Sequence, residues 1–312
     1  MKISEVIQYL ETIAPPGLQE NYDNAGLLVG DKNEEVTGIM ISLDATEEIV
    51  QQASDNHCNL IISHHPIIFS GLKKMTGTNY IERTVISAIK KNIALYAIHT
   101  NLDSIQGGVN QKFADKLNLV DCEILQPRKG VLKKLVTFVP SASADMLRQV
   151  LFDAGAGNIG AYDHCSYNVS GTGTFRGNET TNPYVGVRGK DHQEPETRIE
   201  TIFPFWLEDQ LISALTKNHP YEEAAFDIYP LDNVYQNAGA GLIGKTATSY
   251  SEEEFLRFVK DTMGSGSVRY TALRNKPVER VAVCGGSGSF LLKEAIHKGA
   301  DVFITADFKY HQ

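Results

Sequence analysis

Short apolar runs alternate with amphipathic stretches through the first 120 residues, and this alternation constrains the fold more than any other feature. Residues 36–43, 59–63 and 93–98 are apolar runs of strand length, and residues 46–56 and 82–91 between them have helical spacing. A βαβαβα order predicts parallel strands joined by right-handed crossovers. We therefore predict an α/β fold whose core is a mostly parallel sheet.

Each of the three apolar runs ends in side chains that can bind a metal or move a proton. In chain order, the runs are followed by Asp44, by His64 and His65, and by His99 and Asp103. The carboxyl ends of parallel strands meet at one edge of a sheet, and ligands bind there. The sequence therefore predicts that these five side chains converge on one edge.

The residue types at this edge are typical of a metal site. His64 and His65 offer neutral nitrogen ligands to zinc, iron or manganese, although a hydrogen-bonding pair is the alternative. Asp103 can ligate or bridge metals, as carboxylates do in two-metal hydrolytic sites, or form a turn or cap. His99 could be a direct ligand or could orient Asp103 or a water. Asp44 could orient a histidine, face a substrate or cap the next helix.

We accordingly predict His64, His65 and Asp103 as metal ligands. Asp44 and His99 are the candidates for catalytic proton transfer. No residue pattern predicts an organic cofactor.

The rhythm changes in the middle of the chain. Residues 127–245 follow the order βαββαβ, which is the ferredoxin-like pattern, and the α/β rhythm then returns. We predict a core domain of residues 1–126 plus 246–312, interrupted by an α+β insert at 127–245.

Two further motifs have less specific interpretations. Residues 285–289, Gly-Gly-Ser-Gly-Ser, could bind an anion through backbone N–H groups or could pack a helix closely on a strand. They do not match a P-loop or a dinucleotide fingerprint. Residues 219–223, His-Pro-Tyr-Glu-Glu, favour a structured turn or an interface over a ligand set.

Composition excludes some classes of function. Lys plus Arg is 29 and Asp plus Glu is 38, and the net charge of -9 argues against general binding of nucleic acid. The four cysteines form no C-x-x-C pair and are expected to be reduced thiols. Neither a signal peptide nor a membrane span is predicted, so the expected location is the cytoplasm.

Several motifs together resemble a known family, the NIF-three-like family, whose bacterial members are often labelled GTP cyclohydrolase 1 type 2 homologs. The resemblance covers essentially the whole chain, and the insert resembles the PII-like or CutA-like domain of longer members. The matching motifs lie at residues 22–30, 43–46, 63–66, 99–103, 284–288 and 307–311.

The resemblance implies a dinuclear site with two divalent ions per intact chain, and by motif His64, His65 and Asp103 are its ligands. It also implies a toroidal homohexamer whose sites face an internal cavity. A further His and Glu of the family, in a Gly-His-x-x-x-Glu segment, have no equivalent in residues 1–312. The expectation is therefore either a shortened C-terminal segment or a site that lacks a bridging carboxylate.

Two functions from different classes fit these observations. The first is a metal-dependent hydrolase, of the GTP cyclohydrolase type that the family label suggests, for a nucleotide or another small molecule. The alternative is a non-catalytic metal-handling or regulatory protein that stores, senses or delivers the metal. Turnover by metal-replete protein favours the first, and tight binding without turnover favours the second.

Overall fold

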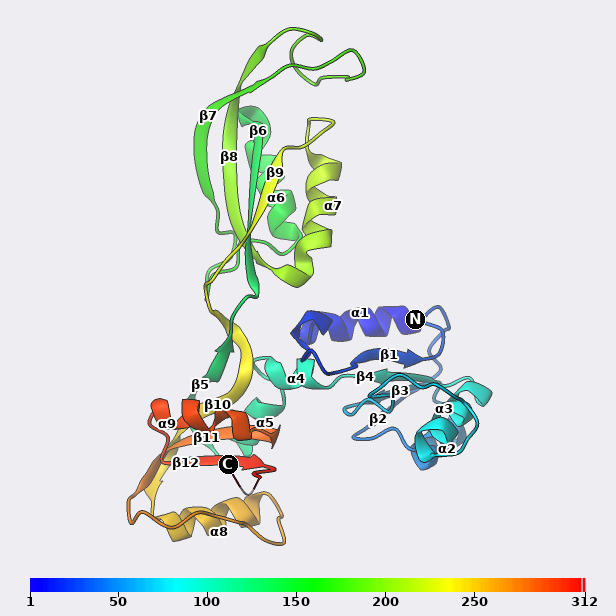
Figure 1. Ribbon diagram of the computed structural model, residues 1–312, viewed down its shortest axis with the longest axis vertical. Helices are drawn as coiled ribbons and strands as arrows, with labels where there is room; N and C mark the ends of the chain where they lie inside the picture. The colour runs from blue at the N-terminus through cyan, green and yellow to red at the C-terminus, as the bar shows by residue number, and fades with distance from the viewer. Residues whose placement is uncertain (310, 312) are drawn as a thin grey trace. The chain divides into compact units, whose positions relative to one another are not determined.

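The computed structural model describes residues 1–309 and 311, so Tyr310 of the C-terminal motif lies outside the described residues. The chain divides into two compact units (Figure 1). Unit 1 is Met1–Pro127 with Asn237–Gln312, and unit 2 is Arg128–Gln236. The predicted boundaries of the insert are 127 and 245. The fold is mixed α/β with several separate sheets.

The first sheet of unit 1 has the order β1-β4-β3-β2. Its strands are β1 (Gly26–Val29), β2 (Ile39–Ser42), β3 (Leu60–Ser63) and β4 (Ala94–Ala97). Strands β2, β3 and β4 are parallel, as the βαβαβα order predicts, whereas β1 runs antiparallel to β4. The carboxyl ends of β3 and β4 therefore lie side by side.

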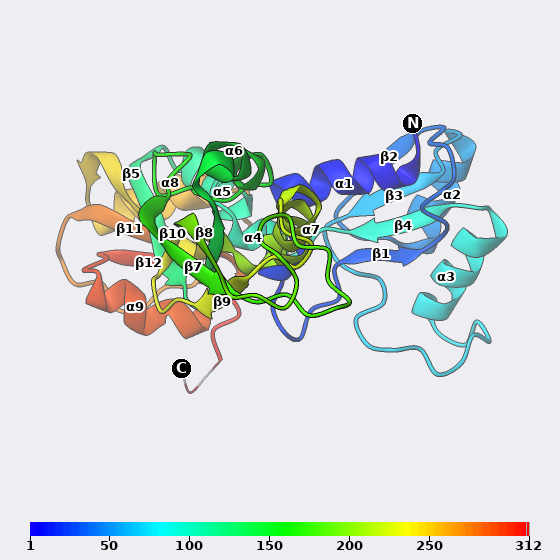
Figure 2. The ribbon, with the colours of Figure 1, turned by 90° about the horizontal axis from the view of Figure 1, so that it is seen from above.

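Helices cover both faces of this sheet, which is why every residue of β3 and β4 is buried. Leu60 and Tyr96 pack with Ile3 of α1 (Ile3–Ile13) on one face. On the other face, Ile61 and Leu95 pack with α2 (Glu47–Asp55) and α3 (Tyr80–Lys90). Figure 2 shows α1 and α3 on opposite sides of the strands.

The N-terminus of α2 is capped by Thr46, whose hydroxyl accepts a hydrogen bond from the Ile49 N–H at 3.2 Å. Such a cap stabilises a helix by about 1 kcal/mol. Because Thr46 occupies this position, Asp44 is not the cap. Beyond β4 the chain forms the short helix α4 (Thr100–Ser104) and then α5 (Val109–Lys116). The 3-10 turn η1 (Pro16–Leu18) packs against α4.

Unit 1 contains a second sheet, with the order β12-β11-β10-β5. Its strands are β5 (Leu119–Arg128), β10 (Tyr235–Tyr250), β11 (Val278–Ser287) and β12 (Val302–Ala306). Strand β11 runs parallel to β12 and antiparallel to β10. The prediction of one mostly parallel core sheet is therefore wrong in this half. The helices of this half are α8 (Glu252–Thr262), the 3-10 turn η4 (Ser289–Leu291) and α9 (Leu292–His297).

Unit 2 is one antiparallel sheet, ordered β7-β8-β6-β9, with two helices on one face (Figure 1). Its elements are β6 (Leu132–Pro140), η2 (Ser141–Ser143), α6 (Ala144–Asp153), β7 (Tyr167–Phe175), β8 (His192–Pro204), η3 (Phe205–Leu207), α7 (Glu208–Asn218) and β9 (Phe226–Pro230). This is the split βαβ order that the sequence predicts. Leu147 of α6 and Leu211 of α7 form its core with Ile199.

Among the helices of the described residues, none is both long enough and apolar enough to cross a membrane.

Candidate metal centre

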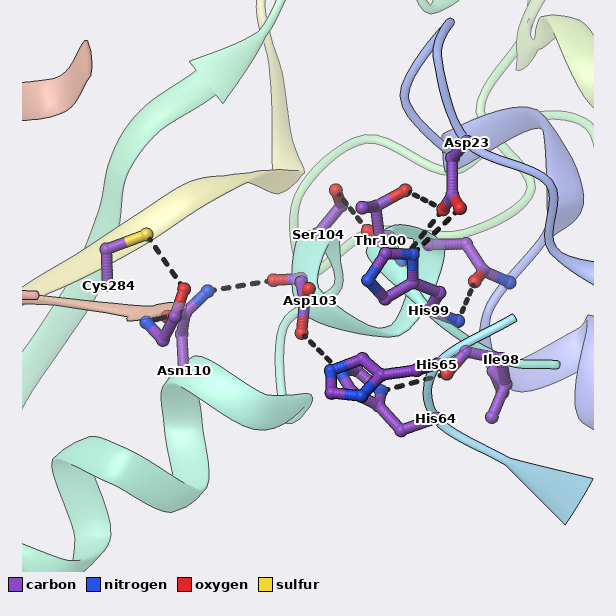
Figure 3. A network of polar contacts seen from close by, with 12 residues as sticks. Asp23, His64, His65, Ile98, His99, Thr100, Asp103, Ser104, Asn110 and Cys284 are labelled. Carbon is purple, nitrogen blue, oxygen red and sulfur yellow. Dashed lines mark hydrogen bonds and ion pairs between the residues drawn. The ribbon is translucent and has the colours of Figure 1, made fainter. Parts of the chain in front are cut away.

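Three histidines converge at the carboxyl ends of β3 and β4 (Figure 3). His64 and His65 follow β3 directly, and His99 precedes the first residue of α4. Their ring centroids are 5.0 Å apart for His64 and His65, 5.2 Å for His64 and His99, and 5.5 Å for His65 and His99. One nitrogen from each ring lies within 4.8 Å of the other two. The parallel register of β3 and β4 thus brings together side chains that are about 35 positions apart in the chain.

Each of the three rings has its Nδ1 atom held by an oxygen. His64 Nδ1 lies 3.0 Å from the Ile98 carbonyl, His65 Nδ1 lies 2.8 Å from Asp44 Oδ1, and His99 Nδ1 lies 2.7 Å from Asp23 Oδ1. Carbonyl and carboxylate oxygens only accept, so a neutral ring donates its hydrogen from Nδ1. The Nε2 lone pair of each ring is then left for a metal, and this is the arrangement that orients histidine ligands in metalloproteins.

Asp44 and His99 can now be assigned positions. Asp44 orients His65, which is one of the three roles that the sequence left open for it. His99 lies within the cluster of ring nitrogens together with His64 and His65. This position fits a direct ligand, which is one of the roles that the sequence left open for it.

Asp23 is the site residue that the sequence analysis missed. Its side chain is fully buried, and it accepts hydrogen bonds from His99 Nδ1, from the Asn24 N–H at 2.7 Å and from the Thr100 N–H and hydroxyl. Burial alone would raise the pKa of Asp23, but these hydrogen bonds together hold it below its usual value. The residue lies in the motif at 22–30 rather than at a strand end, so strand-end reasoning could not find it.

Asp103 approaches the cluster from α4. Its Oδ1 lies 3.7 Å from His64 Nε2 (Figure 3). Burial raises the pKa of Asp103, with the neighbouring histidines opposing this effect, and burial lowers the pKa of His64. A low pKa keeps the His64 ring neutral and therefore able to bind a metal.

The second sheet of unit 1 supports Asp103 through one buried amide. Asn110 Nδ2 donates to the Asp103 carbonyl at 2.9 Å, and its Oδ1 accepts from the Gly285 N–H at 2.8 Å (Figure 3). Next to Gly285, the Cys284 thiol is buried, which raises its pKa to about 11. The position of Asp103 therefore depends on contacts with β11.

The donor set fits a borderline metal. Imidazole nitrogens suit zinc and iron, and the Asp103 carboxylate also suits manganese, whereas magnesium and calcium prefer sites built from oxygen alone. Two atoms bound to the same small ion lie roughly 3–3.5 Å apart, given metal–nitrogen bonds of about 2.1 Å. The 3.7 Å between His64 Nε2 and Asp103 Oδ1 is close to that spacing.

The glycine-rich segment at 285–289 favours the packing alternative. Gly285 and Gly286 continue β11, and the N–H groups of Gly285 and Gly288 donate to Asn110 Oδ1 and Thr305 Oγ1, both at 2.8 Å. A Cβ atom at Gly288 would lie only 2.5 Å from Cys284 Cβ. The N–H groups of Gly285 and Gly288 are therefore used within the fold, and this favours close packing over anion binding at these two positions.

Comparison with known proteins assigns the family. The whole chain, residues 1–312, matches the family described as Duf34/NIF3 (NGG1p interacting factor 3). Proteins named GTP cyclohydrolase 1 type 2 homolog are 40% identical in Halalkalibacterium halodurans, over 100% of this chain and 85% of that one, and 37% identical in Bacillus subtilis, over 98% and 83%.

Solved structures agree with this assignment. A Bacillus cereus protein related to NIF3 superposes with a TM-score of 0.86 at 39% identity, over all of this chain and 84% of that one. Staphylococcus aureus protein SA1388 gives a TM-score of 0.75 at 30% identity, over 100% and 82%. The chain belongs to the DUF34/NIF3 family.

Proposed function

We propose that this chain is a metal-dependent hydrolase. The observation that carries the proposal is the convergence of three imidazoles, one nitrogen of each lying within 4.8 Å of the others. Their Nδ1 atoms are all held by oxygens, which leaves the Nε2 atoms for a metal. Catalytic zinc sites typically use three protein ligands and keep one position open for water, whereas structural sites fill all four. Three converging rings match the catalytic ligand number for one ion. If Asp103 joins them, four protein ligands shared between two ions still leave positions open for water, and this favours catalysis over storage.

We assign His64, His65 and Asp103 as ligands, as the sequence predicts, and add His99. Zinc, iron or manganese are the candidate metals, and these four side chains would hold one ion or two. A bound divalent ion of this kind lowers the pKa of a coordinated water to about 7 and polarises the substrate.

The protein's own residues supply proton transfer and orientation. Where its carboxylate is not held by an ion, Asp103 is the group placed to accept a proton from an attacking water, because burial raises its pKa. Asp23 and Asp44 hold the hydrogens of His99 and His65 on Nδ1. These two carboxylates are positioning residues, and they act through the histidines.

Two exposed aromatic rings beside the site indicate a substrate with a flat ring. Tyr22 and Phe69 are 66% and 51% exposed, and their ring centroids lie 6.3 Å apart. Asn24 Nδ2 donates to the Ile68 carbonyl at 2.6 Å and joins the loops that carry the two rings. Burial, and then the charges of Glu20, Asp23, Asp103 and Cys284, raise the pKa of Tyr22. Tyr22 also directly precedes Asp23, the carboxylate that holds His99.

Exposed aromatic faces stack on heterocycles in water. A purine nucleotide satisfies this requirement, and the relatives' name makes GTP the first candidate to test. Tyr22→Ala should then raise KM more than it lowers kcat.

The remaining features of the resemblance stand as proposals of the same kind. We infer that unit 2 is a PII-like or CutA-like domain, supported by its split βαβ order, and that the protein works in the cytoplasm as a toroidal homohexamer. Light scattering of the purified chain tests the assembly, because a hexamer has six times the mass of the 34.4 kDa chain.

The activity test uses the full chain loaded separately with zinc, manganese or iron(II), and GTP as substrate, with opening of the purine ring followed by absorbance. We expect turnover by the wild type and a loss of at least about 100-fold in His99→Ala. His297→Ala is the matched control, since its side chain is 83% exposed on α9. Metal bound by the wild type without turnover of any purine nucleotide would contradict the hydrolase and leave a metal-handling role.

A further inference from the structure

A cavity of about 470 Å³ opens on the face of the unit 2 sheet that α6 and α7 do not cover. Phe138, Arg198 and Val169 lie side by side across β6, β8 and β7 and line it. The adjacent residue Ile199 faces the helices, and successive residues of a strand point to opposite faces. The volume is within the range of sites for small molecules, roughly 300–1,000 Å³.

Two glycines of β7, Gly171 and Gly173, line this cavity. Gly171 has no atom within 4 Å of where a Cβ would lie, so the backbone is bare at that point. At Gly173 a Cβ would lie 2.2 Å from Glu196 Oε2. The absence of a side chain at Gly173 is therefore what allows the Glu196 carboxylate to lie across the strand.

Glu196 is a buried carboxylate without a basic partner in the described part of the chain. It is 8% exposed, and the hydrogen bond it accepts comes from the Tyr221 hydroxyl, 2.7 Å from Oε1. The nearby guanidinium of Arg198 is paired with Glu200 at 2.9 Å, and Glu200 also pairs with Lys134 at 2.9 Å. Burying an unpaired charge is costly, so a cation that enters this cavity gains a partner already stripped of most of its water.

Aromatic rings line the cavity around this carboxylate. The ring centroids of Phe175 and Tyr221 lie 5.7 Å apart, and Phe138 of β6 also lines the cavity. Tyr221 is fixed by His219, whose Nδ1 accepts from the Tyr221 N–H at 3.1 Å and whose Nε2 donates to the Phe138 carbonyl at 3.0 Å. The motif at 219–223 is thus a structured turn, as the sequence favours, and its function is to hold an aromatic wall.

We propose that this cavity is a binding site for a small organic cation, a guanidinium group on a short apolar chain. The planar guanidinium would donate to the free lone pairs of Glu196, and the chain would lie between Phe138, Phe175 and Tyr221. Guanidinium groups pair with carboxylates through two parallel N–H bonds and stack on aromatic faces, so this head group matches both features. A primary ammonium has the charge but not the planar fork, and it should bind more weakly.

The test is titration of the full chain with n-butylguanidinium. Calorimetry measures the affinity, and saturation-transfer NMR of the ligand detects its binding. The neutral isostere n-butylurea and the anion n-butyrate are the matched ligands. We expect the guanidinium to bind at least about tenfold more tightly than the urea, since a hydrogen bond to a charged group is stronger than one between neutral groups. Butyrate should not bind.

Variants locate the binding. Glu196→Gln keeps the shape and an acceptor for Tyr221, and it should weaken guanidinium binding roughly 10- to 100-fold. Gly173→Ala should weaken it as well, by displacing the carboxylate. Asp209→Asn, which removes an exposed negative charge on α7, should leave the affinity unchanged. His64→Ala should also leave it unchanged, which separates this site from the metal centre.

Three results would overturn the proposal. The first is that the wild type binds the guanidinium and the urea with equal affinity. The second is that Glu196→Gln binds the guanidinium as tightly as the wild type does. The third is that the wild type does not bind the guanidinium at millimolar concentration. The first and third need no variant, so the proposal stays testable if a substitution prevents folding. If the guanidinium does not bind and this face becomes protected from solvent when the chain self-associates, another copy of the chain covers the cavity.

Discussion

Two pairs of parallel strands in unit 1, β3–β4 and β11–β12, end in residues typical of binding sites. The two ends differ in whether the polar groups of those residues are already hydrogen-bonded within the fold. At the ends of β3 and β4, three histidines use Nδ1 for hydrogen bonds within the fold, and within the described residues their Nε2 atoms make none. Asp103 Oδ1 lies 3.7 Å from His64 Nε2. At the end of β11, beside β12, the N–H groups of Gly285 and Gly288 are both used by neighbouring side chains. Parallel topology places candidate groups at a sheet edge, and the hydrogen-bond partners decide which of them can bind a ligand.

The largest effect should come from the residues that orient the histidines. Asp23→Asn removes the charge that holds His99 and should lower metal affinity roughly 10- to 100-fold. Asp44→Asn should cost less, because the Asp44 side chain is 57% exposed whereas that of Asp23 is 0% exposed. Competition with a metal-binding dye measures both affinities. Equal losses in the two variants would show that burial of the carboxylate does not matter.

A substitution in the glycine-rich turn at the end of β11 should lower the stability of the fold and leave metal affinity unchanged. Gly288→Ala places a Cβ within 2.5 Å of Cys284 Cβ and 2.7 Å of Thr305 Oγ1, and overpacking of this kind costs about 1–3 kcal/mol. Chemical denaturation measures the loss, and the dye competition above should show unchanged affinity per folded chain. A variant of unchanged stability would contradict the close packing assigned to this turn.

Glu82 gives a pH-dependent test of the loop before α3. The N–H groups of Thr78 and Thr76 each donate to its carboxylate at 3.0 Å, and they lower the pKa of Glu82. The folded chain therefore binds fewer protons here than the unfolded chain. The stabilisation is complete above the unfolded pKa of about 4.3 and is lost as the pH falls through the folded pKa.

Glu82→Gln should accordingly lower Tm at pH 7, and the difference from the wild type should shrink as the pH is lowered below about 4. Thermal unfolding followed by circular dichroism across this range measures it. A difference that grows on acidification would contradict the assigned direction of the pKa.

The smallest effect concerns the Cys284 thiol. Burial, and then the charge of Asp103, raise its pKa to about 11, so little thiolate forms at pH 8. Alkylation with iodoacetamide, followed by mass spectrometry, should be slower at Cys284 than at Cys58 or Cys165, which are partly exposed. In urea the three rates should become equal. Faster reaction at Cys284 in the folded protein would contradict its buried position.

Strand-end residues of the first sheet were predictable because local patterns determine them. The apolar runs before His64 and His99 identify β3 and β4, and their parallel pairing follows from the helices between them. Asp23 was not predictable in this way, because its bond to His99 spans 76 residues and starts from a loop. The state of the glycine-rich turn likewise depends on Asn110, which lies 175 residues earlier.

The second sheet of unit 1 was predicted only in part, for a similar reason: β11 and β12 are parallel as expected, but β10 is antiparallel to β11. Its strands β5 and β10 adjoin the boundaries of unit 2, and no helix of unit 1 separates them, so the crossover rule gives no information about their pairing. In unit 2 the strands and helices follow one another closely, and the predicted βαββαβ order is the one observed.

The central claim is that three imidazoles at the ends of β3 and β4 form a metal site, and the most direct test is metal content per chain. Elemental analysis would compare the wild type with His64→Ala and with His297→Ala, each purified without chelator. Our account predicts one or two ions per chain in the wild type and in His297→Ala, and almost none in His64→Ala. Metal content that is negligible in the wild type, or unchanged in His64→Ala, would contradict it.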